Sequence, residues 1–302
     1  MFSTNEKKRS KRRQILSQYT FILPQLILFV GLTIVPFFVA IPILFTDMAS
    51  FTDPQINPVG LRNFAALFTD PSVQRDYLPA LQRTLVFVVL NYTTVYIFGL
   101  SLALLMYEVG FKGGFFTIIY LPLMLSGLAV GYMAVMMFSR GTGTGNLLLL
   151  ELELISKAID IYSPEGTAFI LPLMVGWRYA GYNMAIFLSG LLSIPNETID
   201  ASKVDGTNYW QRLWHVYFPQ MLPSFIMATT MCLIGSFAVF DELVAMGALY
   251  VNPEAKFLSV LFFTYGFQVN RLALGMTLAV ITFLPLVFIG VALQRLQRRL
   301  TI

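Results

Sequence analysis

The sequence predicts an all-α membrane protein with six transmembrane helices, and three observations support this fold class. Of the 302 residues, 57% are hydrophobic and only 12% are charged, whereas a soluble domain carries about 25% charged residues. Six runs have the length of about 20 mostly apolar residues that crosses the hydrocarbon of a bilayer. The basic residues cluster, since six of the 20 lysines and arginines fall between Lys7 and Arg13. We therefore expect lipid to be the main solvent of this chain.

The six predicted spans are 21–45, 80–107, 115–138, 168–192, 221–248 and 270–293. The first run is too long for the hydrophobic region of a signal peptide, and no clear small-x-small cleavage site follows it, so we expect it to be retained. The expected organisation is a basic tail at 1–20, a first helix with its outer loop at 21–79, a five-helix core at 80–293 and a second basic tail at 294–302.

An even number of spans puts both termini on one side of the membrane. With the termini in the cytoplasm, the inner segments hold twelve lysines and arginines and the outer segments hold seven. The positive-inside rule therefore favours cytoplasmic N- and C-termini. The basic run at Lys7–Arg13 contains no aromatic residue and abuts an apolar segment, so we expect membrane lipid, and no nucleic acid, as its neighbour.

The connections between the spans differ in kind. Segment 46–79 holds the turn signals Asp53-Pro54 and Asp70-Pro71, which predict an ordered outer cap with room for one short helix. In the second outer loop, 147–161 is predicted to form an amphipathic helix that lies on the membrane. Segment 250–268 is predicted as a third outer loop.

The inner loop from Ile194 to Pro223 is polar and carries mixed charges, unlike most of the chain. Asn196 is expected to cap a short helix, which Gly206 ends by taking a positive φ. Thr207 or Asn208 then caps a second helix that runs to about Phe218. This helix–bend–helix segment, 194–219, is called the elbow below. It is either a docking surface for a soluble partner or an ordinary re-entry loop on the lipid headgroups.

The elbow resembles the signature of the inner-membrane subunits of ATP-binding-cassette importers. That signature reads Glu-Ala-Ala, three residues, Gly, nine residues, Ile, one residue and Leu-Pro. This chain has Asp200-Ala201-Ser202, then Gly206, then Val216, Phe218 and Pro219, at the same spacing. The resemblance implies that the elbow docks into a cleft on an ATPase. The residues it assigns to coupling are Asp200, Ala201, Ser202, Lys203, Asp205, Gly206 and Pro219.

Further segments are similar to the carbohydrate branch of that family, namely Gly60–Phe64, Lys112-Gly113, Leu121-Pro122, Trp177 and Phe240-Asp241. The resemblance implies a type I importer permease fold in a prokaryotic inner membrane. It also implies three kinds of partner: a second homologous permease, two ATPase subunits and an extracytoplasmic solute-binding protein. ATP and Mg²⁺ would then belong to the ATPase, and this chain would need no cofactor.

Polar residues within the predicted spans suggest where a solute could pass. Arg178 lies about 15 Å deep if its helix begins near residue 168, and a charge at that depth usually faces protein or a water-filled path. The substrate-path candidates are Asn91, Trp177, Arg178, Tyr182, Asn183, Asp241 and Glu242. The alternative is that Arg178 pairs with Asp241 or Glu242 and only fixes helix packing. We expect Arg178→Leu to abolish uptake while assembly survives.

Some functions are disfavoured by residues that the chain lacks. It has one cysteine, Cys232, and one histidine, His215, so neither an internal disulfide nor a structural metal site is expected. No GxxxxGK[ST] loop occurs, so the chain itself is not expected to hydrolyse ATP. A self-sufficient secondary transporter would show paired repeats, which we do not find. An intramembrane enzyme would need ionisable residues at one depth, whereas Arg178, Asp241 and Glu242 are expected at different depths.

Overall fold

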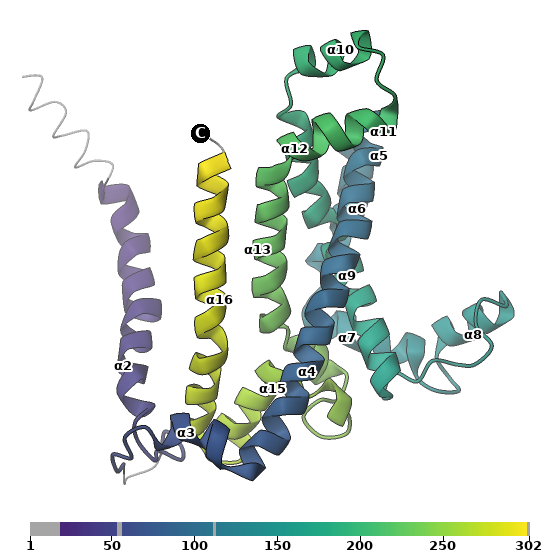
Figure 1. The fold of residues 1–302 in the computed structure, drawn as a ribbon. Helices are drawn as coiled ribbons and strands as arrows, with labels where there is room; N and C mark the ends of the chain where they lie inside the picture. Colours follow the sequence, from purple (N-terminus) through teal and green to yellow (C-terminus); the bar gives the residue numbers. More distant parts are fainter. Residues whose placement is uncertain (1–18, 53–55, 111–112, 301–302) are drawn as a thin grey trace, which may run out of the picture.

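The computed structural model describes residues 19–52, 56–110 and 113–300, and these ranges form helices and connecting turns with no strand. Long helices run side by side, helix α10 (Asn196–Val204) lies beyond one end of them, and α3 (Arg62–Thr69) lies at the other (Figure 1). Three sequence expectations fall outside the described residues: the basic run of the first tail, the turn at Asp53-Pro54, and Lys112.

Four helices of the described residues are long and apolar enough to cross a membrane. They are Tyr19–Ile43, Pro71–Val109, Leu222–Ala245 and Leu272–Arg299, and they match the first, second, fifth and sixth predicted spans. The fourth predicted span is the continuous 29-residue helix α9 (Pro164–Leu192). It is not among the four because Arg178, Asn183 and two tyrosines make it too polar to stand out by composition.

The second helix begins nine residues before the predicted span, because Asp70-Pro71 starts a helix instead of making a loop turn. The Asp70 side chain accepts a hydrogen bond from the backbone N–H of Ser72, and Pro71 occupies the first turn, where its missing N–H costs nothing. The helix α4 (Pro71–Thr94) continues through a π-helical turn at Val95–Leu100 into α5 (Ser101–Val109).

The third predicted span is not one straight helix. It consists of Gly113–Met124 and Gly127–Phe138, which are bent by 90° relative to each other. The first part is α6 (Gly113–Tyr120) followed by a 3₁₀ turn, and the second part is α7. Ser126 lies between them in an extended conformation, and its hydroxyl accepts a hydrogen bond from the backbone N–H of Ala129. The two parts together count as one span only if the bend lies within the membrane.

The fifth span is also interrupted. Helix α13 (Leu222–Ala238) ends at Val239, where ψ is 123°, and Phe240 has φ −144°. The chain then starts a new short helix, α14 (Asp241–Ala245). Asp241 and Glu242 occupy the first turn of α14, directly after this break.

The interruptions meet where α7 packs on α14. A Cβ atom added at Gly131 would lie 2.5 Å from the carbonyl oxygen of Glu242 and 2.6 Å from the Cβ of Ala245. One added at Gly127 would lie 2.7 Å from the Cβ of Asp241. The Gly127–Gly131 pair is thus a genuine close helix contact, and larger side chains there would force α7 away from α14.

Two loop predictions need correction. Segment 250–268 contains α15 (Leu258–Phe263) and a π-helical turn (Thr264–Gln268), with Leu258 and Val260 fully buried, so it is a packed part of the fold. The predicted helix at 147–161 is shorter: α8 runs over Thr144–Glu151 and ends before Glu153, which has φ 55°.

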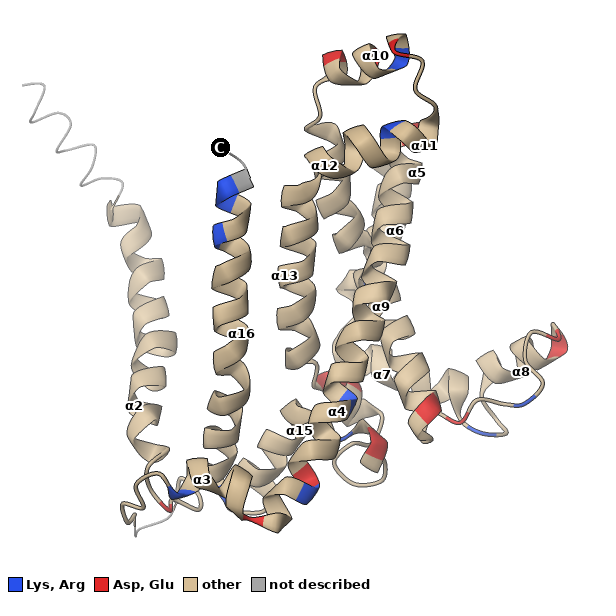
Figure 2. Ribbon diagram, in the orientation of Figure 1, with Lys and Arg blue, Asp and Glu red and all other residues tan. Residues whose placement is uncertain are grey.

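Helix α9 is the central element of the core. Its first half contributes Ile170 and Leu171 to one cluster of buried side chains, and its second half contributes Phe187 and Leu191 to another. By contrast, none of the apolar stretch of the helix Tyr19–Ile43 is buried within the chain. The final helix α16 (Leu272–Leu300) includes the arginines of the second basic tail (Figure 2).

The close contact of α7 with α14 gives a first prediction. Gly131→Ala should lower the free energy of unfolding by about 1–3 kcal/mol, because the added methyl group has no space and backbone atoms must move. Gly290→Ala in α16 is the matched control, since nothing lies within 4 Å of its Cβ position. The apparent Tm of the detergent-solubilised protein measures both. Equal Tm values for the two variants would contradict the close contact.

Candidate functional site

The elbow forms as a helix, a glycine bend and a second helix, as predicted. Helix α10 ends in a pair of backbone hydrogen bonds, from Gly206 to Lys203 at 3.0 Å and from Thr207 to Ser202 at 3.2 Å. Gly206 has φ +75°, which a residue without Cβ adopts at little cost. The bend is therefore specified by local backbone geometry.

The second helix starts with a capping box at Asn208. Its side chain accepts from the backbone N–H of Gln211, and the Gln211 side chain accepts from the backbone N–H of Asn208. The structure thereby selects Asn208 over Thr207 as the cap. The helix continues as α11 (Tyr209–Arg212), a π-helical turn (Leu213–Tyr217) and α12 (Phe218–Gln220).

The start of α10 differs from the prediction. Asn196 is the first helical residue, Pro195 occupies the capping position, and no side chain caps the helix. Proline fixes the backbone of the preceding turn, so the helix can begin without the asparagine cap that the sequence suggested.

The two faces of α10 have different surroundings. Ile199 and Ser202 are buried, and Ile199 belongs to the same cluster as Leu213 and Tyr217 of the second elbow helix. Burial raises the pKa of the nearby Tyr209 hydroxyl, and the negative charge of Glu108 adds to this. The remaining predicted coupling residues are exposed: Asp200, Ala201, Lys203, Asp205, Gly206 and Pro219.

The exposed face carries charge of both signs beside one apolar side chain (Figure 2). Lys203 and Asp200 form an exposed ion pair at 2.9 Å. Val204, which the sequence analysis did not single out, is 87% exposed. A valine at the end of a short polar helix was the available signal for this exposed apolar side chain.

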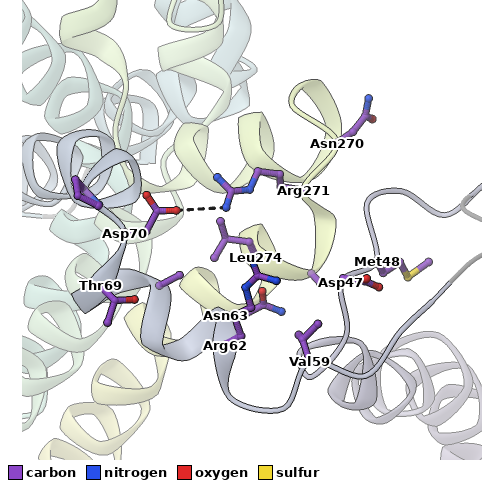
Figure 3. Close-up of a pocket in the computed structure, with 13 residues that line it drawn as sticks. Asp47, Met48, Val59, Arg62, Asn63, Thr69, Asp70, Asn270, Arg271 and Leu274 are labelled. Atoms are coloured by element: carbon purple, nitrogen blue, oxygen red, sulfur yellow. Dashed lines mark ion pairs between the residues drawn. The ribbon is translucent and has the colours of Figure 1, made fainter.

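A cavity of about 460 Å³ lies at the end of the molecule opposite the elbow. Its lining residues come from the segment between Asp47 and Pro71 and from the start of α16. Asp70 and Arg271 point toward each other across it (Figure 3), and their carboxylate and guanidinium groups form an ion pair at 3.6 Å. Hydrogen bonds from the Ser72 hydroxyl and N–H lower the pKa of the Asp70 carboxyl, and Arg271 contributes further. This ion pair ties two segments that are distant in sequence.

A second cavity, of about 500 Å³, gathers most of the predicted substrate-path residues and is called the central cavity below. Its lining comes from α4, α9, α13 and α14. Six of the seven candidates line it: Asn91, Arg178, Tyr182, Asn183, Asp241 and Glu242. Trp177 does not line it and is partly exposed elsewhere on α9.

Arg178 forms an ion pair with Glu242, and the distance from Nη1 to Oε1 is 2.6 Å. The two side chains are 15% and 7% exposed. The guanidinium also lies 5.1 Å from the centre of the Tyr179 ring, and its Nε has no hydrogen-bond partner. The structure thus selects Glu242 over Asp241 as the internal partner of Arg178.

This pairing corrects one step of the sequence analysis. Arg178 and Glu242 were expected at different depths, but a 2.6 Å contact requires them to share one depth. The reason is that Glu242 lies in the first turn of α14, directly after the break at Val239–Phe240, and its carboxylate reaches Arg178 of α9. The depths of Arg178 and Glu242 in the membrane are therefore no argument against an intramembrane enzyme. Clustered metal ligands, which many such enzymes use, are absent from the described residues.

The wall of the central cavity near α13 contains residues that sequence reasoning missed. Asn91 donates to the Ser236 hydroxyl at 2.9 Å and lies 3.6 Å from the Cys232 sulfur, while its own Oδ1 accepts no hydrogen bond. Asn183 donates to the carbonyl of Tyr179 at 3.0 Å. The spacing of Cys232 and Ser236, four residues apart on one helix face, was the available signal.

The ion pair gives a second prediction and revises an expectation. Arg178→Leu should lower the free energy of unfolding by about 3–5 kcal/mol, because it leaves the buried Glu242 carboxylate without a partner. Assembly should then fall together with uptake. The double variant Arg178→Leu/Glu242→Leu should recover most of the loss. Unfolding midpoints of the single and double variants measure this, and a single variant as stable as the unaltered chain would contradict a structural role for the pair.

Comparisons with known proteins agree with this architecture. Solved structures with the same fold include a bacterial ABC transporter involved in the import of the acidic polysaccharide alginate. That chain is 23% identical, with a TM-score of 0.75 over 99% of this chain and 100% of the other. An inward-facing MetNI methionine ABC transporter is 17% identical, with a TM-score of 0.56 over 77% of this chain and 99% of the other.

Curated relatives match along most of the chain. A probable starch degradation products transport system permease, AmyD of Thermoanaerobacterium thermosulfurigenes, is 29% identical over 90% of this chain and 91% of the relative. The multiple sugar-binding transport system permease MsmF of Streptococcus mutans is 27% identical over 95% and 98%. The probable ABC transporter permease YesP of Bacillus subtilis is 31% identical over 78% and 74%.

The family model of the binding-protein-dependent transport system inner membrane component matches residues 95–302, which include the elbow, the ion pair and every lining residue of the central cavity except Asn91. A match over more than half of the chain shows the family. This chain belongs to the binding-protein-dependent transport system inner membrane components.

Proposed function

We propose that this multi-pass membrane protein is the permease subunit of an ATP-driven importer for a sugar or a related hydroxyl-rich solute. It forms half of the translocation path, and a second homologous permease forms the other half. Two ATPase subunits bind ATP and Mg²⁺ and hydrolyse the ATP, and an extracytoplasmic solute-binding protein delivers the solute. The named sugar permeases among the relatives support the carbohydrate class.

The single observation that carries the coupling role is the construction of the elbow. Its inner face is fixed by burial of Ile199 and Ser202, and its bend is fixed by hydrogen bonds at Gly206. Its exposed face carries Asp200, Ala201, Lys203 and Val204. Helix α10 lies beyond the end of the long helices (Figure 1). A rigid projection whose exposed face carries charges of both signs beside an exposed valine suits docking on a soluble partner, whereas a loop lying on headgroups needs neither feature.

We propose six passes with cytoplasmic N- and C-termini, in the type I importer permease fold. Helix α9 has 29 residues, which is about 43 Å of helix and enough to span. The bent pair Gly113–Met124 and Gly127–Phe138 counts as one further pass. The start of the helix Tyr19–Ile43 and the end of α16 lie at the same end of the molecule as α10 (Figure 1). This arrangement supports an even number of passes.

A self-sufficient secondary transporter is not favoured. The family to which the chain belongs consists of inner-membrane components of systems that also have a binding protein. A permease that worked alone would have no use for a rigid projecting elbow.

The third prediction tests coupling through Gly206. The chain itself has room for a side chain there, because nothing lies within 4 Å of the Cβ position. Gly206→Asp places a Cβ in a left-handed backbone conformation, which is a local strain, but it meets no neighbouring atom. The permease should therefore stay folded while the co-purified ATPase falls at least tenfold. Gly141→Asp is the matched control, since Gly141 also has a positive φ, +86°, and open space, at the opposite end of the molecule. ATPase recovery at the unaltered level in Gly206→Asp would exclude coupling through this bend.

The fourth prediction tests the side on which the elbow lies. Cys232 is the only cysteine and is buried, so Cys232→Ala gives a background for labelling. In that background, Lys203→Cys should react with a membrane-impermeant maleimide only after permeabilisation. Thr69→Cys, at an exposed site of the outer cap, should react in intact spheroplasts. The reverse pattern would overturn the topology and the coupling role together.

A further inference from the structure

We propose that the central cavity is specific for uncharged, hydroxyl-rich solutes and rejects sugars that carry carboxylates. This inference rests on the proposed function, because it assumes that the cavity is part of the path for a saccharide. It goes beyond that function by assigning the charge class of the solute. The residues that carry it are Arg178, Glu242, Asp241 and Asn91.

The positive charge of Arg178 is already neutralised. Its Nη1 lies 2.6 Å from Glu242 Oε1, and both side chains are largely buried. Among the described residues that line the cavity, Arg178 is the single basic one. A carboxylated sugar would have to displace Glu242 to bind it.

Glu242 cannot move aside easily. Its backbone packs against Gly131, where even a Cβ atom would come within 2.5 Å of its carbonyl oxygen. Its carboxyl group packs near Gly127, since a Cβ there would lie 3.0 Å from Oε1. A displaced Glu242 would also remain buried without a countercharge, which is strongly unfavourable. The geometry therefore keeps Arg178 occupied.

The carboxylate that remains free is Asp241. It lines the cavity and is exposed, and no hydrogen bond or ion pair joins its side chain to another described residue. With one arginine against two carboxylates, the described lining has a net formal charge of −1. An anion entering this space would be repelled by Asp241, and the described lining offers no unpaired cation to offset that repulsion.

The other polar groups also favour a solute that donates hydrogen bonds. Asn91 is 5% exposed, and its Oδ1 accepts no hydrogen bond, so a further acceptor placed nearby would be unfavourable. Sugar hydroxyls can donate to Asp241, while the rings of Tyr179 and Tyr182 and the side chains of Met231 and Ile234 offer apolar contact to sugar faces. This lining thus differs from what an acidic polysaccharide needs.

The test uses the permease purified with its co-purifying subunits in lipid nanodiscs, without the binding protein, so that only the permease selects. The probes are maltotriose and mannotriose, each compared with its derivative oxidised to carboxylates at C6. Calorimetric titration should give at least tenfold tighter binding of each neutral trisaccharide. Each pair shares size, linkage and hydroxyl pattern apart from C6, so the ratio isolates the effect of charge.

Three variants separate the effect of side-chain charge on solute binding from the effect of lost folding. Asp241→Asn should shift the ratio of affinities at least threefold toward the oxidised probes, because the amide removes the negative charge that repels them. Glu242→Gln should tighten the oxidised probes further by releasing Arg178. If that variant fails to fold, Asp241→Asn alone tests the charge selectivity, because Asp241 has no partner among the described residues whose loss would destabilise the fold. Glu151→Gln, on the distant α8, removes one carboxylate elsewhere and should change nothing.

The outcomes distinguish this inference from the function on which it rests. Oxidised probes that bind as tightly as neutral ones, or an unchanged ratio in Asp241→Asn, would overturn the charge selectivity and leave a sugar permease in place. Absence of binding for all probes in every folded variant would overturn the carbohydrate function itself, and the selectivity with it.

Discussion

Arg178 lies in the middle of a helix that is buried along most of its length, and an unpaired guanidinium there would carry a desolvation cost of several kcal/mol. Its ion pair with Glu242 removes that cost and in doing so constrains three other elements. Glu242 lies in the first turn of α14, directly after the break of the fifth span at Val239–Phe240. Helix α7 has to carry glycines where it packs against α14. The central cavity is the space that these helices enclose.

The elbow, by contrast, is held mainly by hydrogen bonds between residues that are close in sequence. Its bend comes from hydrogen bonds between residues three to five positions apart, and its second helix begins with a capping box between Asn208 and Gln211. Only Ile199 and Ser202 attach α10 to the rest of the fold by burial. A segment built this way keeps its shape when the helices beneath it move, which is what a lever between an ATPase and a membrane path requires.

The two sites lie in regions of contrasting charge. Charged residues are concentrated at the ends of the molecule, and the long helices between them carry few (Figure 2). Within that apolar middle, Arg178, Asp241 and Glu242 are brought to one place although 64 residues separate Arg178 from Glu242. In a protein whose solvent is lipid, such a cluster is stable only because Arg178 and Glu242 neutralise each other. Asp241 then gives the lining its net negative charge.

The sequence by itself determined the membrane class, the helical composition, the elbow with its bend at Gly206, and the residue types that line the central cavity. These features depend on composition, on run length and on interactions between near neighbours, all of which can be recognised in a linear chain. Only the tertiary structure decided that Glu242 and not Asp241 pairs with Arg178, that Trp177 lies outside the cavity, and that the Gly127–Gly131 pair is a real contact. It also decided that the third span bends by 90° and that 250–268 packs as a helix. Each of these depends on where a helix breaks and which distant helix then meets it, and run length and hydropathy carry no information about either.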